Sequence, residues 1–322
     1  MKMTFLEAIK TGIENEMKQN ENVYILGEDV GAFGGCFGVT AGLFDKYGDK
    51  RVKDTPISEG AIVGCAVGSA ATGLRPIAEL MFGDFVTVAM DMIVNQAAKM
   101  RYMFGGKINL PLVVRMPIGA GVQASAQHSQ SLEAWFTHVP GLKIVYPSTP
   151  EDALGLMMSS VEDNNPVIFF EHKLLYGISG EVADDIKPIP LGVAKVQREG
   201  TDVTVIATGK MVHEALNAAE KLSKEGISVE VIDPRTLYPL DKKTIFESVE
   251  KTNKALVITE EHKRGGYGGE ISAIISEECF DNLDAPVVRI GALNVPMPYA
   301  PTLENCVIPN AEDIINGIRK LF

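Results

Sequence analysis

Hydrophobic residues occur along this chain in two alternating kinds of segment. Short, continuous apolar runs bounded by Gly or Pro alternate with longer stretches whose apolar residues recur at helical spacing. Continuous apolar runs are typical of parallel strands that helices cover on both faces. The strands predicted in the first half of the chain are residues 23–27, 75–82, 111–117, 142–147 and 166–171. The pattern therefore predicts an α/β fold with mainly parallel sheets flanked by helices.

The predicted helices lie between and before these strands. The first falls within residues 1–20, where Thr4 and Glu7 have the spacing of a capping box. Further helices are predicted at residues 58–72, 84–104 and 150–163. The last of these has Thr149 as its cap and Pro150 at its first helical position.

A segment with spaced prolines, residues 186–190, interrupts this alternation, which then restarts. Strands are predicted at residues 202–209, 227–233, 254–261 and 286–291, with a helix ending near residue 225, another at 241–252 and a third beginning at 269. We therefore predict two α/β domains, residues 1–190 and residues 191–322.

Composition and charge narrow the class of protein. The 322 residues are 46% hydrophobic, enough for a sizeable core, and 30 basic against 42 acidic residues give a net charge of −12. An acidic chain offers no electrostatic footprint for nucleic acid or an anionic membrane, and its longest apolar stretch is too short to span a bilayer. Residues 1–20 lack the features of a signal or transit peptide, and the four cysteines show no CxxC spacing. We expect a cytoplasmic protein with buried, reduced thiols.

Two segments carry candidate chemistry, whereas the common phosphate-loop, zinc and nucleophile-elbow motifs are absent. In the first segment, residues 55–73, Glu59 begins an apolar helix in which Gly60, Gly64 and Gly68 recur every four residues. Glu59 is a candidate proton donor or acceptor, and the alternative is a first-turn Glu that complements the helix dipole. In the second segment, residues 116–135, His128 lies in a loop of small polar residues after a strand, where α/β proteins bind ligands.

Six motifs connect these segments to a known family. They are GEDVG at 27–31, DTPISE at 54–59, LRPIAELMF at 74–82, AQHSQS at 126–131, PGLKIVYPSTPEDA at 140–153 and DPRTLYPLD at 233–241. Over nearly its whole length the sequence resembles the β subunit of the decarboxylating component of thiamine-diphosphate-dependent 2-oxo acid and acetoin dehydrogenase complexes. The resemblance implies a transketolase-like pyrimidine-binding domain followed by a transketolase C-terminal domain.

The resemblance also implies roles for individual residues. Glu59 matches the glutamate that activates the cofactor by sharing a proton with its aminopyrimidine, and Phe85 matches the aromatic residue that stacks on that ring. Glu28 and Met81 stand in matching motifs and are expected to bind the cofactor with them. His128 matches the histidine that contacts the substrate-derived intermediate and helps to pass the two-carbon unit to a lipoyl group.

Some relatives of this kind bind potassium. Their ligands match Leu112, Ser160, Val161, Asp163 and Asn165. Some also couple paired sites through an acidic tunnel, to which Asp91 corresponds. Here Val88 is apolar where some relatives carry an acid, and Met92 replaces a common Gln, so this sequence departs from the tunnel pattern.

The family's motif for metal and diphosphate, GDG followed by NN, is missing, because no GDG precedes Asn164 and Asn165. The resemblance therefore implies an α subunit that holds magnesium diphosphate, in an α2β2 tetramer to whose packing the glycine stripe contributes. The enzyme would form hydroxyethyl-thiamine diphosphate from pyruvate or acetoin and reductively acetylate the lipoyl group of an acyltransferase.

Three alternatives stay open at this point. One is a branched-chain 2-oxo acid dehydrogenase β subunit, since substrate contacts come largely from the α chain. Another is half of a split transketolase-like enzyme, although residues 117–138 contain no Lys or Arg for a sugar phosphate. The third is a non-catalytic subunit that only docks an acyltransferase.

Overall fold

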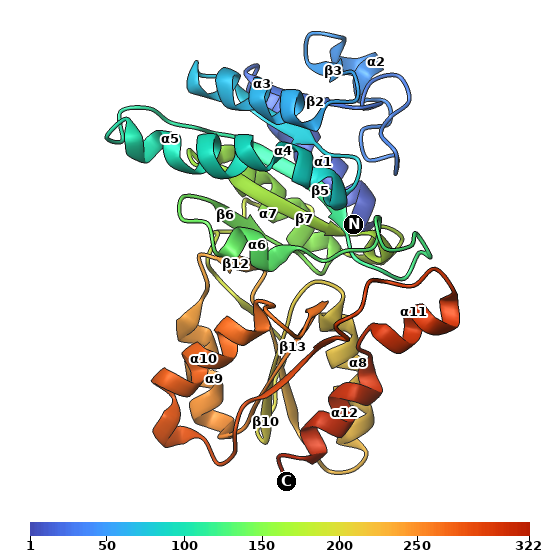
Figure 1. Cartoon of the computed structure of the whole chain (residues 1–322), viewed down its shortest axis with the longest axis vertical. Coiled ribbons are helices and arrows are strands. Elements are labelled where there is room, and N and C mark those ends of the chain that lie inside the picture. Colours follow the sequence, from blue (N-terminus) through green and yellow to red (C-terminus); the bar gives the residue numbers. More distant parts are fainter. The chain divides into compact units, whose positions relative to one another are not determined.

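The computed structural model describes all residues from 1 to 322 and divides into two compact units. The first unit comprises Met1–Ile118 and Trp135–Leu191, and the second comprises Gly119–Ala134 and Gly192–Phe322. Figure 1 shows that each unit is built from strands with helices alongside them. Residues 119–134, which the sequence pattern assigns to the first domain, therefore group with the second unit.

The first unit contains a parallel sheet with the strand order β6-β7-β5-β4-β2-β3. Its strands are β2 (Val23–Gly27), β3 (Val52–Asp54), β4 (Arg75–Glu79), β5 (Val113–Ile118), β6 (Lys143–Val145) and β7 (Val167–His172). All residues of β2, β5 and β7 are buried, so helices or loops cover both faces of the sheet. A short antiparallel pair, β1 (Lys2–Thr4) with β8 (Ser179–Glu181), joins distant parts of the chain.

Local capping signals mark the starts of two long helices of the first unit. The helices of this unit are α1 (Phe5–Gln19), α2 (Leu43–Tyr47), α3 (Glu59–Ala71), η1 (Gly83–Phe85), α4 (Val86–Asp91), η2 (Met92–Ala97), α5 (Ala98–Met103), α7 (Pro150–Glu162) and η3 (Lys173–Leu175), with α6 (Glu133–Thr137) at the unit boundary. The capping box of Thr4 and Glu7 starts α1, and the Thr149 side chain caps α7. Gly12 lets α1 approach α7, because a Cβ there would lie 3.0 Å from the Leu154 carbonyl oxygen.

The second unit has a five-stranded sheet with the order β14-β13-β10-β11-β9, parallel except for β9. Its strands are β9 (Lys195–Arg198), β10 (Val203–Ala207), β11 (Val229–Asp233), β13 (Ala255–His262) and β14 (Val288–Ala292), and β12 (Thr236–Tyr238) is a further short strand outside this sheet. Its helices are α8 (Met211–Ser223), α9 (Lys242–Thr252), α10 (Gly268–Glu278), η4 (Phe280–Asn282), α11 (Pro301–Val307) and α12 (Ala311–Arg319). Figure 1 shows α9 and α10 on one side of this sheet and α8 and α12 on the other. The apolar faces of α8 and α12 form one core with the sheet.

These units confirm the predicted fold class and the predicted strands and helices of both halves, with ends shifted by a few residues. The prediction of buried thiols is wrong for three of the four cysteines, because Cys36, Cys65 and Cys306 are exposed and only Cys279 is buried. Cys65 lies on α3, where apolar sequence alone did not reveal that one side of the helix faces outward. No helix in the structure is both long enough and apolar enough to cross a membrane.

The glycine stripe on α3 has a role inside the chain. A Cβ at Gly60 would lie 3.3 Å from the Val88 carbonyl oxygen, and a Cβ at Gly64 would lie 3.3 Å from the Met92 sulfur. Gly60 and Gly64 thus allow α4 and η2 to pack closely on α3, whereas Gly68 has nothing within 4 Å. Of the three glycines, Gly68 is the one that this chain does not use for packing.

Candidate active site

The carboxyl ends of the parallel strands in the first unit bring two acidic side chains to the same edge of the sheet. Glu28 directly follows β2, and Glu59 begins α3 shortly after the neighbouring strand β3. Both are buried, with 9% and 6% of their surface exposed. Ser58 is the N-cap residue of α3, but its side chain makes no capping hydrogen bond. Glu59 follows as the first residue of the helix, where a negative charge is favoured by the helix dipole.

The two carboxyl groups interact electrostatically. Burial raises the pKa of Glu28, and the negative charges of Glu59 and Asp29 raise it further. Because two nearby carboxylates repel each other, the Glu28 carboxyl group keeps a proton more readily than an ordinary glutamate. At this edge of the sheet, burial and neighbouring negative charge therefore favour the protonated form of Glu28.

A tight turn supports Glu28. Asp29 has a positive φ of 54°, and the Gly31 amide donates a hydrogen bond of 2.6 Å to the Asp54 carboxylate. Any side chain at Gly27 would meet the Glu79 carbonyl oxygen at 2.8 Å. The two glycines of the GEDVG motif thus allow this turn to lie close to the ends of β3 and β4.

Aromatic side chains follow the next strand, β4. Met81 and Phe85 are half-buried on the turn formed by η1. The Phe85 ring stands edge-on to Phe82 with centroids 5.9 Å apart, and Phe82 stands edge-on to Phe37 at 5.4 Å. The sequence-predicted residues Glu28, Glu59, Met81 and Phe85 therefore all follow strand ends at one edge of one sheet, which is where open α/β folds bind ligands.

His128 belongs to the second unit, in a loop that spans residues 119–134. The ring is half-exposed, and its Nδ1 atom contacts the carbonyl oxygen of Gln127. A carbonyl oxygen can only accept, so Nδ1 donates the hydrogen in this contact. A cavity of about 270 Å³ lies beside this loop, lined among others by Ser129, Glu260 and Asn294.

Buried glutamates that sequence reasoning did not single out surround this loop. Glu260, Glu261 and Glu304 accept hydrogen bonds from its backbone. Burial raises the pKa of Glu261 to about 7 despite hydrogen bonds from Tyr267, Ala134 and Gly268. Glu133, whose two carboxyl oxygens have no hydrogen-bond partner in another residue, has a pKa well above its usual range because of burial and the charge of Glu261. Their segments are far apart in the sequence, so no motif marks them.

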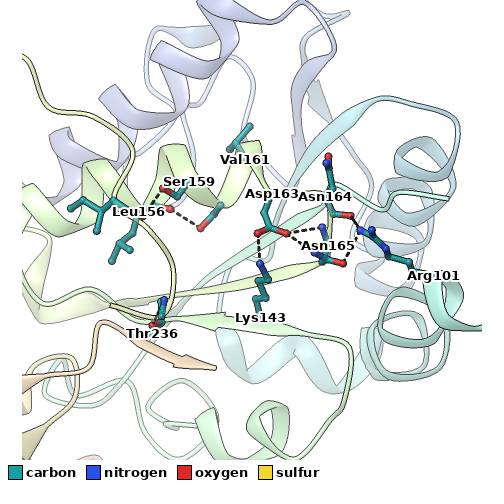
Figure 2. A network of polar contacts seen from close by, with 12 residues as sticks. Arg101, Lys143, Leu156, Ser159, Val161, Asp163, Asn164, Asn165 and Thr236 are labelled. Atoms are coloured by element: carbon teal, nitrogen blue, oxygen red, sulfur yellow. Dashed lines mark hydrogen bonds and ion pairs between the residues drawn. The ribbon is translucent and has the colours of Figure 1, made fainter. Parts of the chain in front are cut away.

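The residues predicted to bind potassium all lie in the first unit, and Figure 2 shows the polar contacts around Asp163 and Asn165. The Asp163 carboxylate pairs with Lys143 and accepts hydrogen bonds from the Asn165 backbone and side chain at 2.8 and 2.9 Å. These hydrogen bonds lower the pKa of Asp163, although burial acts in the opposite direction.

Several carbonyl oxygens among these residues already have donors. Arg75 donates to the carbonyl oxygens of Val161 at 2.7 Å and Asp163 at 3.2 Å. The Leu112 carbonyl accepts from the Val167 amide, and the Ser160 hydroxyl donates to the Leu156 carbonyl. A carbonyl oxygen accepts two hydrogen bonds, so those of Val161 and Asp163 have room for one further partner, but the Arg75 charge beside them opposes a cation.

Asp91, at the end of α4, is exposed and accepts a 2.7 Å hydrogen bond from the Asn95 side chain. The nearby Val88 side chain is also exposed. The Val88 backbone nevertheless packs against Gly60, the residue after Glu59, because a Cβ at Gly60 would lie 3.3 Å from the Val88 carbonyl oxygen.

Comparisons with known proteins find similar sequences over nearly the whole chain. A family model described as the transketolase pyrimidine binding domain matches residues 1–179, and one described as the transketolase C-terminal domain matches residues 192–314. The chain is 49% identical to the 2-oxoisovalerate dehydrogenase subunit beta of Bacillus subtilis, over 99% of this chain and 98% of that protein.

Two other kinds of relative are similar to a comparable degree. The acetoin:2,6-dichlorophenolindophenol oxidoreductase subunit beta of Bacillus subtilis is 49% identical over 98% of this chain and 96% of its own length. The pyruvate dehydrogenase E1 component subunit beta of Rickettsia bellii is 46% identical over 100% of this chain and 99% of its own length. A solved structure named split gene transketolase, inactive beta4 tetramer, has a TM-score of 0.82 over 99% of this chain and 98% of that chain, and at 24% identity it supports the fold alone.

Proposed function

Because the chain belongs to the family of β subunits of thiamine-diphosphate-dependent 2-oxo acid and acetoin dehydrogenases, we propose that it provides the pyrimidine-binding half of such an enzyme, acting on pyruvate or acetoin. The observation that carries this proposal is the pair of buried carboxyl groups, Glu28 and Glu59, at the carboxyl edge of the sheet. A 2-oxoisovalerate dehydrogenase subunit is as similar as the acetoin relative, so a branched-chain 2-oxo acid is the second candidate substrate.

The residues at this edge suit an aminopyrimidine. When bound, thiamine diphosphate supplies the carbanion that adds to a carbonyl group and then takes up the electrons of the broken bond. Glu59 would share a proton with a ring nitrogen of the pyrimidine, and Phe85 and Met81 would contact the apolar faces of the ring. The raised pKa of Glu28 favours its neutral form, which lessens the negative charge beside Glu59.

His128 would act on the substrate-derived group. With hydrogen on Nδ1, its Nε2 atom can accept a proton from the substrate and return it. We propose that this residue assists the transfer of the two-carbon unit to a lipoyl group on a partner acyltransferase.

We further propose that an α subunit completes the site in an α2β2 tetramer in the cytoplasm. The support is the naming of the relatives as beta subunits, together with the absence of a GDG motif for magnesium diphosphate in this sequence. Potassium at Leu112, Ser160, Val161, Asp163 and Asn165 stays a proposal, to which we assign no step. Equal melting temperatures in potassium and sodium chloride of the same ionic strength would count against it.

The first experiment is a turnover assay of this chain purified with its α subunit. Thiamine diphosphate, magnesium and a dye as electron acceptor are present, and pyruvate, acetoin and 2-oxoisovalerate are supplied separately. We expect dye reduction with one of them and none from the chain alone. No turnover with any substrate would redirect the proposal to a sugar phosphate or to a non-catalytic docking subunit.

The second experiment replaces Glu59 by Gln, which keeps the shape of the side chain but removes its titratable proton. We expect at least a ~100-fold loss of turnover, the size of general acid–base effects, with unchanged melting temperature and assembly with the α subunit. The matched control is Glu270→Gln, because Glu270 is an exposed acid in the first turn of α10. Normal activity of Glu59→Gln would mean that Glu59 only complements the dipole of α3.

A further inference from the structure

The loop of residues 119–134, which carries His128, has an unusual backbone. Gly119, Gly121, Gln123 and Ser125 all have positive φ values, between 57° and 96°. The loop closes on itself through a 3.0 Å hydrogen bond from the Gly119 amide to the Gln130 carbonyl. The two amides that follow Gly119, those of Ala120 and Gly121, donate to acceptors outside the loop.

Two buried glutamates of the second unit supply those acceptors. Glu260, at the end of β13, accepts from the Ala120 amide at 2.7 Å and from the Ser131 hydroxyl at 3.3 Å. Glu304, on α11, accepts from the Gly121 amide at 2.8 Å. Glu260 thus holds both ends of the segment that contains His128, and Glu304 holds the first end again.

These contacts are stronger constraints than ordinary loop contacts. Glu260 and Glu304 are 4% and 1% exposed. A buried carboxylate is costly unless it is hydrogen-bonded, and charge-assisted hydrogen bonds are short and directional. Ala120 also packs with Ala292, Met297 and Val307, so the first end of the loop has an apolar contact beside its polar ones.

We propose that Glu260 and Glu304 are positioning residues that fix the loop so that His128 is presented to the substrate in one orientation. This inference rests on the proposed function, because it takes His128 as a catalytic residue. The hydrogen bonds that both glutamates accept here come from the loop itself, so we assign them no contact with the reacting atoms. Their effect on turnover passes through the backbone of Ala120, Gly121 and the segment that follows.

The test compares single and double variants in the assembled enzyme with its α subunit. We expect Glu304→Ala to lower kcat for acetylation of a lipoyl domain by about 10–100-fold, the cost of misplacing a catalytic group, with little change in KM for the substrate. Glu304→Gln, whose side-chain oxygen still accepts from the Gly121 amide, should recover most of that loss. We likewise expect Glu260→Ala to lower kcat and Glu260→Gln to recover most of that loss.

The decisive measurement is the double variant His128→Ala with Glu304→Ala. If Glu304 acts through His128, the double variant is no slower than His128→Ala, because the histidine it positions is already gone. The control is Glu312→Gln, which removes an exposed acid paired with Lys221 and should leave kcat unchanged. Should Glu304→Ala fail to fold, Glu304→Leu keeps the volume of the side chain and replaces it in the comparison.

Two outcomes overturn different claims. Losses that multiply in the double variant, or normal kcat in Glu304→Ala and Glu260→Ala, would show that these glutamates do not position His128. Normal kcat in His128→Ala would instead remove the role of His128 in the proposed function, whatever the glutamate variants do.

Discussion

At the scale of single residues, the structure contains a buried acid outside the candidate site whose protonation affects stability. Glu16, on α1, is 4% exposed, and its Oε1 atom has no hydrogen-bond partner. Burial raises the pKa of Glu16 to about 7, the charge of Glu162 adds to this, and Arg75 opposes it. The folded protein therefore keeps Glu16 neutral at a pH where the unfolded chain has ionised it.

The sign of the pH effect follows from this difference. Below pH 4.5 Glu16 is protonated in both states and adds no pH dependence, and between pH 4.5 and about 7 the free energy of unfolding falls as pH rises. Above pH 7 the loss reaches about 3–4 kcal/mol, since one pKa unit corresponds to about 1.4 kcal/mol. We expect Glu16→Gln, which is neutral at every pH, to raise the free energy of urea unfolding more at pH 8 than at pH 5.

The matched control for Glu16 is Glu21→Gln, because Glu21 is exposed just after the same helix. Its effect on unfolding should be the same at both pH values. An equal effect of Glu16→Gln at pH 5 and pH 8 would contradict the assignment of the pH dependence to Glu16.

At the scale of secondary-structure elements, two glycines in connecting segments allow the effect of backbone strain to be distinguished from the effect of close packing. Gly73, between α3 and β4, has a φ of 104°, and a Cβ added there would have no other atom within 4 Å. Gly141, before β6, has a φ of 102°, but a Cβ there would lie 1.9 Å from the Ala98 carbonyl oxygen of α5. Both glycines have the same backbone conformation, but only Gly73 has space for a Cβ atom.

We expect Gly73→Ala to lower the free energy of unfolding by about 1–2 kcal/mol, the strain of a positive φ in a residue with a Cβ. Gly141→Ala carries the same strain plus the displacement of α5 from β6, so we expect a loss of about 4 kcal/mol or more. Urea unfolding of both variants, or of Gly73→Ala alone if the other does not accumulate, measures the difference. Equal losses would mean that α5 yields to the added carbon.

At the scale of the whole molecule, the exposed cysteines report which surfaces a partner covers. In the chain alone, Cys36, Cys65 and Cys306 are exposed, whereas Cys279 is buried and burial raises the pKa of its thiol. Burial and the charges of Glu79 and Asp29 also raise the pKa of Cys36. We expect a thiol reagent to modify Cys65 and Cys306 rapidly, Cys36 more slowly and Cys279 only on unfolding.

Assembly with the α subunit should change this pattern. Cys65 lies near Gly68 on the side of α3 that this chain leaves exposed, and we propose that the α subunit packs there. Cys65 should then become protected while Cys306 keeps its reactivity, with Cys65→Ser as the control that identifies the protected thiol. Unchanged labelling of Cys65 in the assembled enzyme would place the α subunit on another surface.

Much of this molecule follows from local patterns in its sequence. Continuous apolar runs such as residues 23–27 predict buried parallel strands, because both faces of such a strand must be apolar. The capping residues Thr4 and Thr149 mark helix starts correctly, since a cap depends only on neighbours in the chain. Helix α12 was not predicted, although Asn310 and Asp313 have the spacing of a capping box that would have indicated it.

Periodicity, capping and short motifs are enough to establish the fold class, the order of strands and helices, and the candidate residues Glu59 and His128. Only packing between distant segments brings residues 119–134 into the second unit and places Glu260 and Glu304 against the loop of His128. The same packing determines which cysteines are exposed. The cause is separation along the chain, because Glu304 accepts its hydrogen bond from a residue 183 positions away, and no local pattern encodes such a contact.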